Sequence, residues 1–214
     1  MDIYVDSANL AEIKAAGELG LCDGVTTNPT LLLREGTNQI EMLQAIAKEV
    51  AGPVHAEVLS LDYKGIMKEA LELAKMGDNI VIKIPMMNEG LKAAKSLKAE
   101  GIATNITLIF SATQAILAAK AGASYVCPFL GRLDDIGSNG LMLLSQIRTI
   151  FDANPDLETG IIAASIRTPD HVIELAQMGV DILTIPAKIL AMMEKHPLTD
   201  SGIAQFTEDA KKFK

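Results

Sequence analysis

One lysine in this sequence lies where a charged side chain is costly and where nucleophilic chemistry becomes possible. Lys83 lies within residues 80–85, an apolar run that is β-branched at most positions and ends in a proline. Such a run is typical of a strand buried on both faces of a parallel sheet. Burial disfavours the charged form of an amine, and a neutral lysine amine attacks carbonyl groups. We predict that Lys83 forms a Schiff base with a ketone sugar; the alternative is a lysine whose packed stem simply reaches solvent.

Polar residues lie at comparable positions in other strand-like runs. Asp6 ends the first run, Asn28 follows the second, and Glu57 lies near the end of the third. Asn105 and Thr107 are two residues apart in the fifth run, so they share one face of a strand. Taken singly, such residues also form turns and caps. Together around a lysine they suit imine chemistry, because forming and breaking an imine requires several proton transfers.

A second group of residues indicates a phosphate site. Ser165 and Arg167 follow the seventh strand-like run, and Arg132 follows the sixth. Barrel enzymes often bind phosphate near strands seven and eight, and arginine can bind a phosphate group through two parallel hydrogen bonds. The alternatives are surface ion pairs of Arg167 with Asp170 and of Arg132 with Asp134 or Asp135.

Eight strand-like runs alternate with helical patterns along the chain. The runs are residues 2–6, 24–27, 54–58, 80–84, 103–108, 124–127, 160–164 and 181–185. Helical patterns follow at 9–19, 38–50, 62–76, 89–100, 112–121, 139–152, 169–178 and 187–195, with a last one at 200–213. This alternation predicts a (β/α)8 TIM barrel with an extra C-terminal helix, in a single domain over residues 1–214. A doubly wound open sheet is the alternative, although no Gly-x-Gly-x-x-Gly follows the first run.

In such a barrel the active site lies at the carboxyl ends of the strands. Side chains along each strand alternate between the barrel interior and the helix layer. Lys83 shares a face with Val81, whereas the isoleucines on either side of it take the other face. We therefore expect Lys83 to point into the mouth of the barrel.

Composition excludes several classes of partner. The 214 residues carry a net charge of −8, which makes nucleic acid and anionic membranes poor partners. No apolar run is long enough to span a bilayer, and no signal peptide is visible. The two cysteines form no disulfide framework, and the three histidines are far apart in sequence, so we predict no metal site. We expect a cytoplasmic location, where cysteines stay reduced.

Six ordered motifs are similar to those of one known family. They are DSAN at residues 6–9, GVTTNPT at 24–30, VIKIP at 81–85, TNITL at 104–108, PFLGR at 128–132 and ASIR at 164–167. With them the sequence resembles the transaldolase family over nearly its whole length. The resemblance is to the small, single-barrel subfamily, which also contains the fructose-6-phosphate aldolases.

The resemblance implies an aldol mechanism without metal or cofactor, acting on small sugar phosphates. Lys83 would attack the C2 ketone, and the resulting iminium would serve as the electron sink. Asp6 would be the general base for the C4 hydroxyl, while Glu57 and Thr107 would hold a water that shuttles protons. The resemblance assigns the remaining substrate contacts to Asn28 and Asn105 for the dihydroxyacetone unit and to Arg132, Ser165 and Arg167 for phosphate.

Two positions favour a transaldolase of the pentose phosphate pathway over a lyase. Aldolase relatives tend to have glutamine where this chain has Glu57 and tyrosine where it has Phe129. The expected reaction moves a dihydroxyacetone unit from sedoheptulose 7-phosphate or fructose 6-phosphate to glyceraldehyde 3-phosphate or erythrose 4-phosphate. Cys127 is a departure, because transaldolases usually have serine there, and a thiol is the weaker hydrogen-bond partner.

Two alternatives remain for the activity. One is a fructose-6-phosphate aldolase that releases free dihydroxyacetone, and the other is a barrel that binds a sugar phosphate without covalent chemistry. The resemblance also implies a homo-oligomer, a pentamer or decamer, in which the C-terminal helix reaches a neighbour. Packing of that helix on its own barrel is the other possibility.

Overall fold

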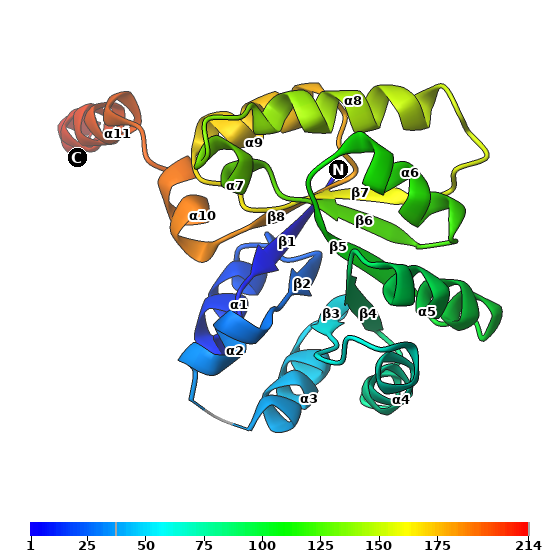
Figure 1. Cartoon of the computed structure of the whole chain (residues 1–214). Helices are drawn as coiled ribbons and strands as arrows, with labels where there is room; N and C mark the ends of the chain where they lie inside the picture. Colours follow the sequence, from blue (N-terminus) through cyan, green and yellow to red (C-terminus); the bar gives the residue numbers. More distant parts are fainter. Residues whose placement is uncertain (37, 214) are drawn as a thin grey trace.

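The computed structural model describes residues 1–36 and 38–213, and its centre is a closed barrel of eight parallel strands (Figure 1). Each strand pairs with the next one along the chain, and β8 closes the barrel against β1. The strands are β1 (Asp2–Asp6), β2 (Gly24–Thr26), β3 (Val54–Glu57), β4 (Ile80–Pro85), β5 (Thr104–Ile109), β6 (Tyr125–Pro128), β7 (Gly160–Ala163) and β8 (Ile182–Ile185). The predicted (β/α)8 barrel is confirmed, and the open doubly wound sheet is wrong.

Helices follow the strands and cover the outside of the barrel (Figure 1). Those that follow the predicted pattern are α1 (Leu10–Glu18), α3 (Gln39–Glu49), α4 (Tyr63–Ala74), α5 (Asn88–Ala99), α6 (Ala112–Lys120), α8 (Gly140–Asp152), α9 (Pro169–Gln177) and α10 (Ala187–Met193). Several begin at a polar side chain that accepts a backbone N–H group, as Asn9 does for α1 and Asp62 for α4.

Two short helices after β2 and β6 were not predicted. They are α2 (Pro29–Arg34) and α7 (Leu130–Asp134), which are too short to show helical periodicity in the sequence. The Asn28-Pro29 pair ends the strand as expected, but it also starts a helix. Asn28 caps α2 through its side-chain oxygen, and Pro29 occupies the first helical position, where proline is well tolerated.

The strands separate two apolar regions. Ile80, Ile82 and Ile84 of β4 are buried in the large core between the barrel and the helices. A smaller buried cluster, of which Tyr4 and Ile162 are members, fills the inside of the barrel. Lys83 has the opposite orientation from the three isoleucines, so it faces the barrel interior as predicted.

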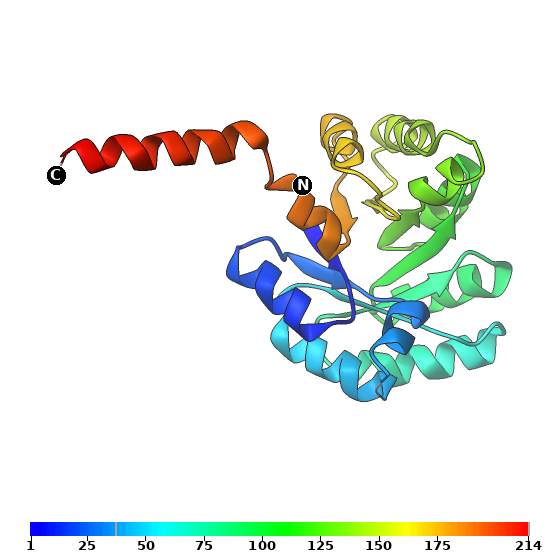
Figure 2. The same cartoon turned by 90° about the vertical axis from the view of Figure 1, so that its left-hand side faces the viewer.

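The C-terminal segment forms the predicted extra helix. Helix α11 (Pro197–Ala210) and the short 3-10 helix η1 (Lys211–Phe213) extend away from the barrel (Figure 2). None of the residues of α11 is buried, and its apolar side chains Leu198, Ile203 and Phe206 are 60–75% exposed. Packing of this helix on its own barrel is therefore wrong. In the described part of the chain, no helix is both long enough and apolar enough to cross a membrane.

Candidate active site

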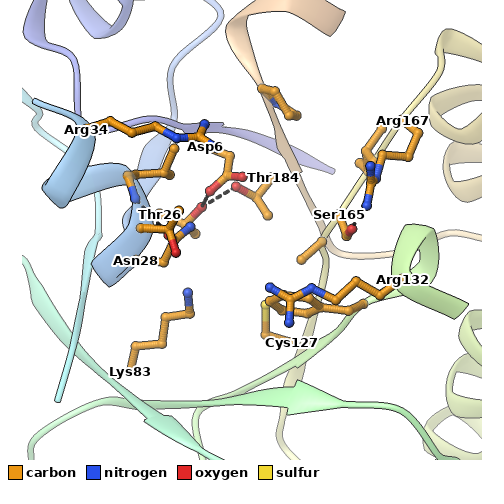
Figure 3. Close-up of a pocket in the computed structure, with 16 residues that line it drawn as sticks. Asp6, Thr26, Asn28, Arg34, Lys83, Cys127, Arg132, Ser165, Arg167 and Thr184 are labelled. Carbon is orange, nitrogen blue, oxygen red and sulfur yellow. Dashed lines mark hydrogen bonds between the residues drawn. The ribbon is translucent and has the colours of Figure 1, made fainter. Parts of the chain in front are cut away.

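A cavity of about 370 Å³ opens at the carboxyl ends of the barrel strands (Figure 3). Its lining draws on residues that are far apart in sequence, because the carboxyl ends of all eight strands meet at one end of the barrel. Eight of the eleven residues predicted for the site line it: Asp6, Asn28, Lys83, Cys127, Phe129, Arg132, Ser165 and Arg167.

Lys83 is buried, and its amine points into the cavity (Figure 3). Its Nζ donates a hydrogen bond to the Thr27 carbonyl at 2.9 Å and lies 3.1 Å from Oε2 of Glu57. Glu57 and Lys83 are paired positions on β3 and β4, so the strand register alone places the two charges together. The amine therefore becomes a nucleophile only after losing a proton, and the Glu57 carboxylate is within reach to take it.

Asp6 ends β1 on the other side of the cavity. Its Oδ1 accepts a hydrogen bond from Thr26 Oγ1 at 3.0 Å, and the Thr26 hydroxyl also bonds to that of Thr184 (Figure 3). Burial raises the pKa of Asp6, and the charge of Lys83 and the Thr26 hydroxyl offset only part of that rise. The carboxyl therefore takes up a proton at higher pH than an ordinary aspartate, which suits a group that exchanges protons with a substrate.

Three of the predicted residues lie behind the surface of the cavity instead of lining it. Glu57 contacts Lys83, while Asn105 and Thr107 are buried on β5, the strand next to β4. Within the described residues, Asn105 Oδ1 and Thr107 Oγ1 have no hydrogen-bond partner. Buried polar atoms usually have one, so the Asn105 oxygen can still accept a hydrogen bond from a bound molecule or water, and the Thr107 hydroxyl can accept or donate one.

The opposite wall of the cavity is rich in arginine. The Arg132 guanidinium lies 4.8 Å from the centre of the Phe129 ring, in a cation–π contact. Arg167 forms an ion pair with Asp135, at 2.8 Å from Nη2 to Oδ2, and its Nε donates to Ser165 Oγ at 3.4 Å. The alternative pairing of Arg167 with Asp170 is thus wrong. Arg132 forms no salt bridge with any residue that the structure describes, so its alternative pairing is wrong as well.

A glycine and a strained serine bring this wall together. A Cβ atom at Gly131 would lie 2.2 Å from the Ser165 carbonyl oxygen and 2.6 Å from Arg167 Nε, so only glycine allows α7 this close to the turn after β7. Ser165 has a φ of 63°, in the left-handed region that few non-glycine residues adopt. Such strain is common at ligand sites. Together the two residues place Arg132 beside Ser165 and Arg167.

Comparison with known proteins gives a consistent result. A sequence model of the family described as "Transaldolase/Fructose-6-phosphate aldolase" matches residues 3–214. A probable transaldolase of Clostridioides difficile (strain 630) is 55% identical over 209 residues, which cover 98% of this chain and 96% of the relative. A probable transaldolase of Clostridium tetani (strain Massachusetts / E88) is 57% identical over 211 residues, covering 99% and 98%. One of Desulfitobacterium hafniense (strain DSM 10664 / DCB-2) is 55% identical over 214 residues, the full length of both chains.

The chain belongs to the transaldolase/fructose-6-phosphate aldolase family. The resemblance drawn from six sequence motifs is confirmed, and the protein is an enzyme of this transaldolase or aldolase class. Among residues 1–36 and 38–213, no three His, Cys, Asp or Glu side chains come together in a way that could hold a metal ion.

The lining of this family member's cavity includes residues that were not predicted, among them Thr26 and Arg34. Thr26 lies two positions before Asn28, so the alternation along a strand that linked Asn105 with Thr107 could have identified it. Arg34 lies on α2, across the cavity from Arg132 (Figure 3). No signal in the sequence identified Arg34, because the helix that positions it was itself too short to predict.

Cys127, the departure from the usual serine of transaldolases, is a buried thiol in the cavity wall. Burial raises its pKa to about 11, although the charge of Lys83 acts in the opposite direction. At neutral pH the side chain is therefore a protonated thiol and not a thiolate nucleophile.

Substitution of Thr26 by valine tests the electrostatics of Asp6. Removing the hydroxyl that lowers the pKa of Asp6 should raise that pKa further. A carboxylate base loses activity as the pH falls through its pKa, so the acidic limb of the pH profile of kcat/KM should move to higher pH. Thr184→Val keeps the bond from Thr26 to Asp6 and is the matched control. An acidic limb that stays in place or moves to lower pH would contradict this account.

Proposed function

We propose that this chain is a transaldolase that transfers a dihydroxyacetone unit through a Schiff base on Lys83. The donor is sedoheptulose 7-phosphate or fructose 6-phosphate, and the acceptor is glyceraldehyde 3-phosphate or erythrose 4-phosphate. One observation carries the proposal: a buried amine that faces the cavity, with one carboxylate 3.1 Å away and a second carboxyl, that of Asp6, in the wall of the same cavity. Covalent catalysis by an amine needs these groups together.

Imine formation begins with loss of the extra proton from Lys83. The free amine attacks C2 of the ketose, the carbonyl oxygen takes up a proton, and the resulting carbinolamine loses that oxygen as water. The Glu57 carboxylate, 3.1 Å from the amine, takes this proton, and the Thr107 hydroxyl, which has no partner among the described residues, can hold with Glu57 a water that carries protons. These transfers balance, because each proton removed from nitrogen leaves with the water.

Cleavage then uses the carboxyl group of Asp6. Its carboxylate removes the proton of the C4 hydroxyl, the C3–C4 bond breaks, and the electron pair moves into the iminium to give an enamine. The aldose phosphate leaves, an acceptor aldehyde takes its place, and the enamine carbon attacks it. Asp6 returns the proton to the new hydroxyl group. The raised pKa of Asp6 supports this double role, because a carboxyl group that binds a proton more readily than an ordinary aspartate can both take and return one.

Arg132, Ser165 and Arg167 are proposed to bind the phosphate group. Arg132 has no carboxylate partner among the described residues, and Arg167 offers a planar guanidinium at the cavity wall. Such donors match phosphate geometry. On the other side of the cavity, the Asn28 side-chain oxygen is occupied in capping α2. Its amide nitrogen is thereby left to bind the hydroxyl groups of the dihydroxyacetone unit.

Transfer is preferred over release because of Phe129. Its ring holds Arg132 and has no hydroxyl to protonate the enamine, so the intermediate waits for an acceptor aldehyde. The family also contains fructose-6-phosphate aldolases, so release of dihydroxyacetone is the second candidate.

We further propose a homo-oligomer in which α11 packs on a neighbouring copy. We also propose a location in the reducing cytoplasm, which suits the free cysteines Cys22 and Cys127. Cell fractionation tests the location, and recovery outside the cytoplasm would contradict it.

Reduction with borohydride in the presence of fructose 6-phosphate should attach the trapped substrate unit to Lys83. Reduction converts the imine into a stable secondary amine, which mass spectrometry of the peptide containing Lys83 detects. Lys83→Met, checked for folding by circular dichroism, should show no adduct. An unmodified wild-type lysine would contradict the Schiff-base mechanism and favour binding without covalent chemistry.

Without an acceptor aldehyde, the wild type should release dihydroxyacetone far more slowly than it transfers the unit. Combining Glu57→Gln with Phe129→Tyr should raise the release rate by about tenfold, because a phenol can supply the missing proton. Free dihydroxyacetone is measured by a coupled reductase assay. Release as fast as transfer in the wild type would establish the lyase instead.

Loss of the guanidinium in Arg167→Ala should raise KM for phosphorylated donors about ten- to a hundredfold. This is the effect expected when hydrogen bonds between charged groups are lost. Trapping of unphosphorylated dihydroxyacetone should change little. Asp135→Asn removes the ion-pair partner of Arg167 but keeps the guanidinium, so its KM should not rise. Equal damage to both ligands, or an equal rise in Asp135→Asn, would assign Arg167 a structural role.

Light scattering after gel filtration should give the wild type a multiple of the 22.8 kDa chain mass. The exposed apolar side chains of Ile203 and Phe206 are typical of an interface. Changing both to aspartate should therefore lower the measured mass of the assembly. Gln205→Glu, at another exposed position of α11, should leave the mass unchanged. A wild-type mass of one chain would refute the assembly.

A further inference from the structure

A histidine lies inside the barrel, one layer further from the strand ends than the predicted site. His55 precedes Glu57 by two residues on β3, so both side chains face the interior, and it is fully buried. Its ring lies between Tyr4 and Tyr125, with ring centres 5.5 and 5.4 Å away. His55 lies outside the cavity lining, and the strand that carries Lys83 separates β3 from β5, which carries Asn105.

The tautomer of His55 follows from its hydrogen bond. Its Nδ1 lies 3.1 Å from Nδ2 of Asn105, across three strands and 50 residues of sequence. An amide nitrogen can only donate, so Nδ1 accepts, and the single ring proton is on Nε2. Burial and the nearby charge of Lys83 lower the pKa of His55 to about 3. The ring therefore stays neutral, and its Nδ1 stays an acceptor, throughout the neutral range.

This bond fixes how Asn105 presents its side chain. With Nδ2 directed to His55, Oδ1 is directed away and has no partner within the described residues. Asn105 is the position on β5 that pairs with Lys83 on β4. An unpartnered buried acceptor is costly, and a hydroxyl donor from a bound ligand would relieve that cost. Without His55 the amide could turn over and present an N–H group instead.

Packing alone does not explain a histidine here. A phenylalanine would fill the space between the two tyrosine rings and would bury no polar atoms. His55 instead leaves its Nε2 buried without a partner in the described part of the chain, which destabilises the fold. Against this loss of stability, His55 gains the hydrogen bond with Asn105.

We infer that His55 is a positioning residue, which orients Asn105 so that its Oδ1 accepts a hydrogen bond from a hydroxyl of the bound dihydroxyacetone unit. This inference rests on the proposed function, because it requires a hydroxyketone held at Lys83. It gives His55 a role in substrate selection: a ketone that lacks one hydroxyl loses the bond to Asn105. The pair should therefore favour dihydroxyacetone over hydroxyacetone.

The test is a double-mutant cycle with His55→Phe and Asn105→Ala. His55→Phe keeps a ring between the tyrosines and removes the acceptor. It should lower the preference for dihydroxyacetone over hydroxyacetone, measured as trapped adduct on Lys83 against ketone concentration, by about three- to tenfold for one hydrogen bond. In the Asn105→Ala background the same change should have no further effect on that preference. Tyr4→Phe, which removes a hydroxyl from the same layer, should leave the preference unchanged.

Several results would overturn the inference. An equal loss for both ketones in His55→Phe, or effects of the two substitutions that add in full, would make His55 a packing residue. Nitrogen NMR of the histidine-labelled wild type is independent of any variant's folding. It should show the Nε2–H tautomer, and an Nδ1–H tautomer would refute the orientation of Asn105. Wild-type protein that traps neither ketone would remove the proposed function as well, whereas trapping without a His55-dependent preference removes only this inference.

Discussion

The buried ion pair between Lys83 and Glu57 is the interaction on which the site depends. The two side chains are 4% and 12% exposed, and their charged atoms are 3.1 Å apart. Removing two charges from water is expensive, and only close pairing with further hydrogen bonds offsets that expense. Neighbouring parallel strands provide the pairing by register, and the Thr27 carbonyl provides a further acceptor. An unpaired lysine at this position would destabilise the barrel.

The same closed barrel brings charges of both signs to one cavity. Asp6 and Lys83 line it from β1 and β4, while Arg132 and Arg167 come from the segments after β6 and β7. The chain as a whole carries a charge of −8, so anionic ligands are repelled at long range. The arginine wall provides local positive charge inside that field, which makes binding of a phosphate depend on a few residues.

Below the cavity, the inside of the barrel is filled by an aromatic layer and not by aliphatic residues alone. Tyr4, His55 and Tyr125 pack against one another across three strands. Through His55 this layer contacts Asn105, which is beside Lys83 in the strand register. Packing in the barrel interior and orientation of the site are therefore properties of the same side chains.

Local patterns in the sequence determined the barrel, the order of its strands and the side to which Lys83 points. Strand runs, helix periodicity and the alternation of side chains are short-range properties, and parallel strands then bring their carboxyl ends to one place. Contacts across strands could not be predicted in this way: the partner of Arg167 is Asp135, 32 residues away, and that of His55 is Asn105, 50 residues away. Only the tertiary structure revealed the short helices α2 and α7 and the outward direction of α11. The physical reason is that strand register, barrel closure and the packing of one helix on another depend on long-range contacts, which leave no periodic signal in the sequence.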